Sequence, residues 1–405
     1  MSEITLLTGL RQVATCQTPD ESSVRTGHGI ALRGDRVLAI ARDVELRARY
    51  AEAEVIDGEQ GVITPGFVDS HTHAVFGVWR ASEYALRCRG VPYMEIARRG
   101  GGILASVRDV RARSEAELVE LARPRLREML EFGTTTAEIK SGYGLDLEAE
   151  LKMLRAVRRL AEEGPVELVA TFMGAHEVAP EYRGTPDAYV GTVIRDMIPA
   201  VAAEGLAAFC DVFMEPGVFD GSQARQILEA GIRHGLVPKL HADEFEGSGG
   251  AELAAALGAA SADHLGAISA EGIQALSEAR TVATLLPTTL MFLGKRTYAP
   301  ARELIDAGAV VALATDFNPG TSPSSNMALV LTLACSQMGM HPLEALYAAT
   351  FGGARALRLT DGRGKVVEGG PADLVLWDVQ DAAEIPYHFG RPRVRAVWKR
   401  GVRVR

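Results

Sequence analysis

The regular alternation of strand-like and helical runs is the feature of this sequence that most restricts its fold. Eight short apolar runs are separated by stretches with helical spacing, which is the pattern of βα units around a parallel sheet. The predicted strands are an apolar run entered at Pro65-Gly66 that leads to His71, and residues 134–140, 167–175, 208–214, 237–242, 261–264, 281–286 and 309–315. The predicted helices are residues 114–132, 147–163, 187–203, 222–235, 249–257, 269–279, 300–307 and 325–338. Eight such units over about 300 residues predict an α/β fold, a (β/α)8 TIM-like barrel.

Both ends of the chain are rich in short β-like pieces separated by polar turns. These pieces are residues 4–7, 29–32, 36–40 and 54–57 near the N-terminus, and residues 364–377 and 394–402 near the C-terminus. We expect the N-terminal pieces to form a small antiparallel sheet. Because one α/β region separates the two β-rich ends, we predict a small discontinuous β-sandwich domain of residues 1–61 and 362–405, with the barrel in residues 62–361.

The charge and the cysteine pattern restrict the partners and the compartment. A formal net charge of −9 argues against a general nucleic-acid or acidic-membrane binder, but it does not exclude a local basic pocket for a small anion. The four cysteines lie far apart without a C-x-x-C pair, which fits a reducing compartment. The sequence contains neither a signal-peptide pattern nor a run of about 18 apolar residues. We expect a cytoplasmic protein with no nucleic-acid or membrane partner.

Polar residues gather after the predicted strands, at the end of the barrel where active sites lie. They are His71 and His73 after strand one, His176 after strand three, His241 and Glu244 after strand five, His264 after strand six, and Asp316 after strand eight. Residues i and i+2 of a strand share a face, so His71 and His73 can bind one cation together. Three imidazoles and one carboxylate suit Zn²⁺ or iron, with one position left for water.

Such a cation would supply the nucleophile of a hydrolase. It lowers the pKa of a bound water molecule from 15.7 to about 7. The carboxylate of Glu244, in the run His241-Ala-Asp-Glu-Phe-Glu, can take the proton of that water and return it to a leaving nitrogen. The alternative is that Glu244 is a surface glutamate in a polar loop.

Longer motifs identify a family. The most specific are Pro65-Gly-Phe-Val-Asp-Ser-His-Thr-His73, Lys140-Ser-Gly-Tyr-Gly-Leu145, His241-Ala-Asp-Glu244, Ala262-Asp-His264 and Thr315-Asp-Phe-Asn-Pro-Gly-Thr-Ser322. With these motifs the whole chain resembles the amidohydrolase superfamily, and within it the branch that hydrolyses 4-imidazolone-5-propanoate to N-formimidoyl-L-glutamate in histidine degradation. The resemblance implies a small anionic substrate, a zinc or iron ion and a homodimer.

The resemblance also implies a role for each candidate residue. The metal ligands would be His71, His73, His241 and Asp316. Glu244 would shuttle the proton, and His264 would polarise the carbonyl or stabilise the oxyanion. The propionate and ring would be held by Arg80, Tyr93, Tyr143 and His176, and the other ring edge or the product by Asn318, Gly320 and Thr321. From the residues alone, a guanidinium suits a carboxylate, but a surface ion pair is the simpler interpretation of Arg80. Tyr143 is likewise a packed aromatic by default, although its flanking glycines favour exposure in a loop.

The number of metal ions follows from the position of the lysines. Some members of the superfamily bind two metals bridged by a carboxylated lysine at the end of strand four. The predicted strand four, residues 208–214, contains no lysine, and Lys140 belongs to predicted strand two. We therefore predict one metal ion per chain.

Two other functions fit parts of the sequence. A mononuclear deaminase of cytosine or guanine would use the same ligands, glutamate and histidine, but a neutral base needs no carboxylate clamp such as Arg80. A non-catalytic barrel that serves as an interaction module is the second alternative. The complete metal set together with Glu244 and His264 argues against it, because a binding module does not need all six residues.

Overall fold

The computed structural model describes residues 4–91, 95–96 and 100–405, and an eight-stranded parallel sheet lies at its centre. Its strands follow one another in chain order: β8 (Phe67–Asp69), β9 (Thr134–Lys140), β10 (Glu167–Ala175), β11 (Phe209–Met214), β12 (Val237–Ala242), β13 (Ser261–His264), β14 (Val282–Leu285) and β15 (Val311–Leu313). The last strand returns to the first, because the His73 N–H donates to Phe317 O at 2.9 Å and the Asp316 N–H donates to His71 O at 3.0 Å. The sheet therefore closes into the predicted barrel.

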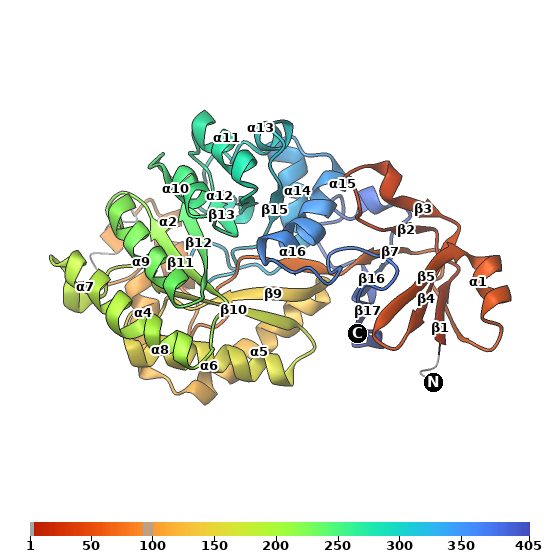
Figure 1. Cartoon of the computed structure of the whole chain (residues 1–405), viewed down its shortest axis with the longest axis horizontal. Coiled ribbons are helices and arrows are strands. Elements are labelled where there is room, and N and C mark those ends of the chain that lie inside the picture. The colour runs from red at the N-terminus through yellow and green to blue at the C-terminus, as the bar shows by residue number, and fades with distance from the viewer. Residues whose placement is uncertain (1–3, 92–94, 97–99) are drawn as a thin grey trace.

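Helices surround the barrel and cover its strands (Figure 1). Several begin at residues whose side chains satisfy the free N–H groups of the first turn; Ser114 and Asp220 each form a capping box. The helices are α2 (Ala81–Cys88), α4 (Ile103–Ala112), α5 (Glu115–Glu131), α6 (Leu147–Glu163), α7 (Pro186–Thr192), α8 (Ile198–Ala203), α9 (Gly221–Arg233), α10 (Gly250–Ala256), α11 (Ala270–Ala279), α12 (Pro287–Phe292), α13 (Ala301–Asp306), α14 (Met327–Met338), α15 (Pro342–Tyr347) and α16 (Gly353–Ala356). None of the described helices combines the length and apolar character that a membrane crossing requires.

Most predicted elements recur with nearly the predicted bounds, and β9, β10 and α6 match residue for residue. The helix predicted over residues 187–203 is an exception. It consists of α7, a π-helical turn (Val193–Met197) and α8. Pro199 in the first turn of α8 has no N–H to donate to the preceding turn, so the regular hydrogen-bond ladder does not run through it.

Two further sheets from both ends of the chain form the predicted small β-sandwich, at the opposite end of the molecule from α7 (Figure 1). One sheet has the order β5 (Arg36–Arg42), β4 (His28–Arg33), β1 (Ile4–Thr8) and β6 (Glu54–Asp57). The other has the order β18 (Val402–Arg403), β17 (Val394–Lys399), β16 (Leu374–Trp377), β7 (Val62–Pro65), β2 (Gln12–Ala14) and β3 (Val24–Thr26). The N-terminal sheet is mixed, not antiparallel as predicted, because β1 pairs with β6 in parallel.

The barrel begins at Gly66, where the chain passes from one sheet to another. The Gly66 N–H donates to Asp373 O in the sandwich, whereas the next N–H, of Phe67, donates to Gly133 O beside the barrel. A Cβ on Gly66 would lie 2.2 Å from Oγ1 of Thr135, so a side chain does not fit at this crossing. The predicted entry at Pro65-Gly66 is confirmed. Residues 62–65, however, pair in the sandwich as β7, and the division into domains at residues 62 and 362 stays a prediction.

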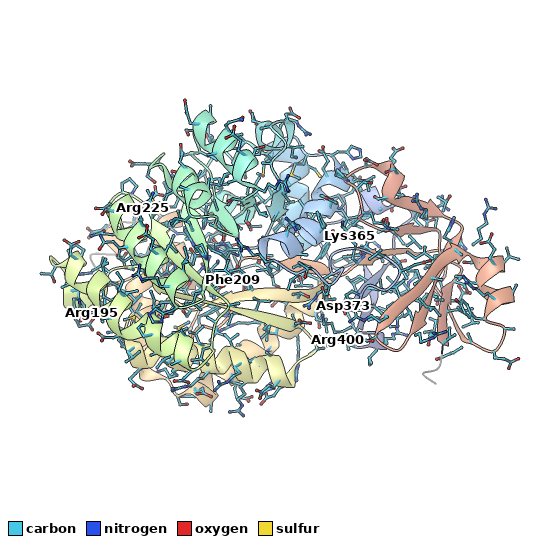
Figure 2. The ribbon with its side chains drawn as sticks, in the orientation of Figure 1. Arg195, Phe209, Arg225, Lys365, Asp373 and Arg400 are labelled. Atoms are coloured by element: carbon cyan, nitrogen blue, oxygen red, sulfur yellow. The ribbon has the colours of Figure 1, made fainter. Side chains whose placement is uncertain are left out.

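Charged side chains join the sandwich to the barrel. Glu167, the first residue of β10, forms ion pairs with Lys399 at 3.3 Å and with Arg400 at 3.2 Å. Asp373 accepts hydrogen bonds from Lys399 Nζ at 2.5 Å and from the Arg400 backbone N–H at 2.7 Å. Asp373 and Arg400 lie where the two parts of the chain meet (Figure 2). These contacts hold the C-terminal strands against the base of the barrel.

Candidate active site

Four buried histidines converge at the C-terminal ends of the barrel strands. His71 and His73 follow β8, His241 lies in β12, and His264 is the last residue of β13. The ring centre of His71 lies 4.5 Å from that of His241, 5.3 Å from that of His264 and 5.5 Å from that of His73. The structure thus brings together residues that lie up to two hundred positions apart in the chain, as predicted.

The two central histidines present nitrogen lone pairs to the middle of this cluster. Nδ1 of His71 lies 2.7 Å from Oδ2 of Asp263, and Nδ1 of His241 lies 3.0 Å from Oδ2 of Asp211. A carboxylate only accepts, so each Nδ1 carries the proton and each Nε2 keeps its lone pair. Both Nε2 atoms are buried without a hydrogen-bond partner in the described part of the chain. Burial lowers the pKa of both imidazoles well below the usual value, which keeps them neutral.

Asp316 completes the cluster from the loop after β15. Its Oδ1 lies 3.5 Å from Nε2 of His71 and 3.9 Å from Nε2 of His73, and its Oδ2 accepts from the Thr289 hydroxyl at 2.5 Å. Burial raises the pKa of this carboxyl to about 7. A positive φ of 51° holds its backbone in a conformation that is rare for aspartate. A carboxylate buried beside neutral imidazoles is stabilised by a cation.

These donors fit a metal ion. Among the described residues, three sets have all their ligand atoms within 4.8 Å of one another: His71, His241 and His264; His73, His176 and His241; and His71, His73 and Asp316. Buried imidazole nitrogens without other partners and an adjacent carboxylate are the ligands of zinc and iron sites. The cluster is therefore a candidate metal centre.

Glu244 and His264 form a pair beside the cluster. Oε1 of Glu244 lies 3.5 Å from Nδ1 of His264. Burial, together with the charges of Asp316 and Glu215, raises the pKa of Glu244 well above its usual value. Burial lowers the pKa of His264 to about 3. The surface-glutamate interpretation is wrong, because Glu244 is only 8% exposed and lines the site.

A cavity of about 1150 Å³ opens above the cluster. Its lining includes His73, His241, Glu244, His264 and Asp316, and five of the predicted substrate contacts: Arg80, Tyr143, His176, Asn318 and Thr321. Tyr143 is buried, not exposed as its flanking glycines suggested, yet its ring still faces the cavity. Tyr93 lies outside the described residues.

Arg80 has free hydrogen-bonding capacity inside this cavity. Its side chain is 9% exposed, and the nearest carboxylate oxygen that pairs with it is Oε2 of Glu83, 3.8 Å from Nε. Nε and Nη1 are buried and donate to no described residue. Gly320 lies against the guanidinium, since a Cβ there would be 1.3 Å from Nη2. A buried guanidinium with unused donors is suited to the carboxylate of a ligand.

Asn318 shapes the loop that carries Gly320. Its Oδ1 accepts from the backbone N–H groups of Gly320 at 2.8 Å and of Thr321 at 2.7 Å. Its Nδ2 donates to Asp316 O at 2.7 Å. The Asn318 amide therefore fixes the loop that begins at Asp316 and lies beside Arg80.

Glu150 shapes the loop that carries Tyr143, and sequence reasoning did not single it out. This buried carboxylate accepts from the backbone N–H groups of Gly142, Gly144 and Leu145 at 2.8 to 3.2 Å. Gly142 O in turn accepts from Nδ1 of His176 at 3.1 Å, and the His176 ring stacks on His73. Glu150 therefore orients Tyr143 and His176 toward the cavity from outside it.

Sequence reasoning also missed the aspartates behind the histidines. Asp211 and Asp263 lie within barrel strands, as do Glu138, Lys140 and Lys239. All five side chains are completely buried. Charged residues inside predicted barrel strands were the available signal, because such residues are almost never fully buried unless they are paired.

Comparison with known proteins places this chain in a family. A model of the amidohydrolase family matches residues 62–404. The imidazolonepropionase of Myxococcus xanthus is 48% identical over 94% of this chain and 91% of its own length. That of Bacillus velezensis is 44% identical over 98% of this chain and 96% of its own length.

Solved structures share the fold at much lower identity. A zinc-bound adenosine deaminase from Xanthomonas campestris has a TM-score of 0.74 and 18% identity, over 99% of this chain and 92% of that chain. A triazine hydrolase from Arthrobacter aurescens has a TM-score of 0.73 and 19% identity, over 100% of this chain and 95% of that chain. The barrel with its sandwich is thus a fold that hydrolytic enzymes share.

Proposed function

We propose that this chain, which belongs to the amidohydrolase family and within it to the imidazolonepropionases, hydrolyses the ring C–N bond of 4-imidazolone-5-propanoate. The product is N-formimidoyl-L-glutamate. One observation carries the proposal. The cavity that contains the histidine cluster also contains a buried guanidinium, Arg80, whose Nε and Nη1 donate to no described residue. A site with a metal centre at one end and an unused guanidinium at the other suits a small cyclic amide with a carboxylate tail.

We assign His71, His73, His241 and Asp316 as ligands of one zinc or iron ion. A divalent cation bound there would lower the pKa of a water molecule to about 7 and polarise the ring carbonyl. The support from the chain is the free Nε2 of His71 and of His241, each fixed by an aspartate on the opposite ring nitrogen. Of the described lysines, Lys140 is the one at the end of a strand near this cluster, and its ammonium is paired with Asp211 and Glu138.

Glu244 carries the proton in this reaction. Water adds to the ring carbonyl carbon, the C–N bond breaks, and the departing nitrogen must receive a proton. A carboxyl whose pKa is raised by burial and by neighbouring acids can accept the proton of the water and deliver it to that nitrogen. We assign to neutral His264, whose Nδ1 lies 3.5 Å from Oε1 of Glu244, the polarisation of the carbonyl or the stabilisation of the developing oxyanion.

The remaining residues position the substrate. Arg80 binds the propionate carboxylate, and Tyr143 and His176 contact the ring, with Tyr93 as a further contact. Asn318, Gly320 and Thr321 would contact the other ring edge or the product. The fixed loops of Tyr143 and Gly320 support this arrangement, because orientation of a bound substrate contributes strongly to rate.

The substrate is tested directly by incubating the purified, metal-loaded protein with freshly generated 4-imidazolone-5-propanoate. We expect its ultraviolet absorbance to disappear and N-formimidoyl-L-glutamate to accumulate. If fully metallated protein leaves the absorbance unchanged but deaminates cytosine or guanine, the proposal is wrong and the chain is a nucleobase deaminase.

We further propose that the protein is a cytoplasmic homodimer with no nucleic-acid or membrane partner. The family resemblance supports the dimer. The net charge of −9 argues against polyanionic partners. A solution mass equal to one chain, measured by light scattering, would contradict the dimer.

Replacing Arg80 with methionine should weaken substrate binding while leaving the metal centre intact. Hydrogen bonds to charged groups contribute about 1.5–3 kcal/mol, so KM should rise at least about tenfold, and kcat can fall as orientation is lost. Arg89→Met is the matched control, because Arg89 follows the same helix α2 but is exposed and outside the cavity. An analogue without the carboxylate should lose much less in Arg80→Met. An equal penalty for both compounds would show that Arg80 does not bind the propionate.

Replacing Gly320 with alanine should displace the Arg80 guanidinium, because the new Cβ would lie 1.3 Å from Nη2. We expect KM to rise in the same direction as in Arg80→Met. The two changes should not add, since both remove one interaction, and additivity fails for residues in contact. Gly390→Ala is the control, as a Cβ there has no atom within 4 Å. If the two effects on KM are fully additive, the effect of Gly320→Ala does not arise through Arg80.

A further inference from the structure

A cluster of five charged side chains fills the barrel directly below the histidines. Lys140, Lys239, Glu138, Asp211 and Asp263 are each 0% exposed. They come from four different strands, β9, β11, β12 and β13. Two ammonium groups thus face three carboxylates in the centre of a protein, where unpaired charge is strongly unfavourable. The reaction proposed above uses none of the five directly.

Lys140 contacts both aspartates that orient the central histidines. Its Nζ lies 2.7 Å from Oδ2 of Asp211 and 3.4 Å from Oδ2 of Asp263, and also 3.0 Å from Oε1 of Glu138. The same Oδ2 of Asp211 accepts from Nδ1 of His241, and the same Oδ2 of Asp263 accepts from Nδ1 of His71. In each of the two carboxylate–histidine pairs, the Lys140 ammonium therefore contacts the same carboxylate oxygen that accepts the hydrogen bond from the histidine.

Lys239 is equally buried but makes different contacts. Its Nζ lies 2.7 Å from Oε2 of Glu138 and donates to Ser70 O at 3.0 Å. It is 3.9 Å from Oδ2 of Asp263, and no described ion pair within 4.0 Å joins it to Asp211. Lys239 consequently neutralises the cluster without bridging the two pairs, and it serves as an internal control for Lys140.

We propose that Lys140 is the positioning residue that sets the ring orientation and tautomer of His71 and His241 together, and so the affinity of the site for its metal ion. The proposal rests on the assignment of these histidines as ligands. With Lys140 in place, both aspartate oxygens are held toward one point and each accepts a hydrogen bond from an imidazole Nδ1–H. Without it, two buried carboxylates repel each other, and neither keeps a fixed geometry toward its histidine.

The test uses two variants of the full chain with equal charge. Lys140→Met combined with Glu138→Gln removes one positive and one negative charge, as does Lys239→Met combined with Glu138→Gln. Both lysines contact Glu138, so the two proteins lose comparable pairs and keep the net charge of the cluster. This design keeps the comparison valid even where Lys140→Met alone does not fold. Zinc affinity is measured by competition with a chromophoric chelator.

We expect zinc to bind at least about tenfold more weakly to the Lys140 double variant than to the Lys239 double variant, since loss of partners behind a metal ligand typically costs 10–100-fold in affinity. Equal affinities in the two proteins, together with unchanged histidine tautomers, would overturn the proposal, because any effect would then follow from removing either buried lysine.

A second readout needs neither metal nor substrate. In the metal-free protein, ¹⁵N resonances of His71 and His241 report which ring nitrogen carries the proton. We expect Nδ1–H forms in the Lys239 double variant and a mixture of tautomers in the Lys140 double variant. Unchanged tautomers would overturn the proposal. A tautomer change without loss of zinc affinity would support the positioning role and instead contradict the ligand assignment.

Discussion

Glu244→Gln is expected to keep the fold and the metal ion but to lower kcat by about 10²–10⁴-fold, the usual contribution of general acid–base catalysis. The amide is nearly isosteric with the carboxyl and cannot accept a proton. Glu244 belongs to none of the three sets of candidate metal ligands, so metal content should not change. KM should change little, because the amide keeps the shape of the cavity wall.

Glu246→Gln is the matched control for this change. Glu246 lies two residues further along the same loop, is exposed and does not line the cavity, so its variant should retain nearly full activity. Steady-state kinetics and metal analysis of both variants decide the question. A change in kcat of less than about threefold in Glu244→Gln would exclude Glu244 as the proton carrier, since acid–base residues contribute far more.

Asp316→Asn is expected to remove both the metal ion and the activity. Asparagine can still accept from the Thr289 hydroxyl, so the loop should keep its shape, but the negative charge facing His71 and His73 is lost. His71→Ala should have the same effect, because the Nε2 that faces the cluster disappears. Elemental analysis after dialysis should give about one metal ion per wild-type chain and almost none in either variant.

Asp306→Asn is the matched control. Asp306, on α13, is exposed and lies outside the cavity, and its substitution removes the same charge. Retention of full metal and turnover in Asp316→Asn would show that the ligand assignment is wrong. A wild-type stoichiometry near two would contradict the single-metal proposal and would direct attention to the set of His73, His176 and His241 as a second site.

Local sequence patterns were enough to predict most of the elements and the end of the barrel at which the candidate site lies. Strand and helix periodicities are local properties, so β9, β10 and α6 could be predicted to the residue. The i, i+2 spacing of His71 and His73 also restricts both to one face of a strand. Because parallel strands all end at the same side of a barrel, residues that follow separate strands could be predicted to meet.

The transition at Gly66 was decided only by the tertiary structure. Residues 62–65 and 67–69 both have strand character, and nothing local distinguishes their partners. The first group pairs with β16, more than three hundred residues away, and the second with β9. Pairing over such distances depends on the register of the closed barrel and on the packing of the sandwich.

The contacts behind the proposed metal ligands likewise depend on the tertiary structure. Lys140, Asp211 and Asp263 each appear in the sequence as a charged residue within a predicted strand, with no local sign of a partner on another strand. Whether such a side chain points into the barrel, and at what height, is set by strand tilt and stagger around the whole barrel. Only in the closed barrel do three strands bring the two aspartates within 3.4 Å of the Lys140 ammonium, where buried charges must be balanced by other groups of the same cluster.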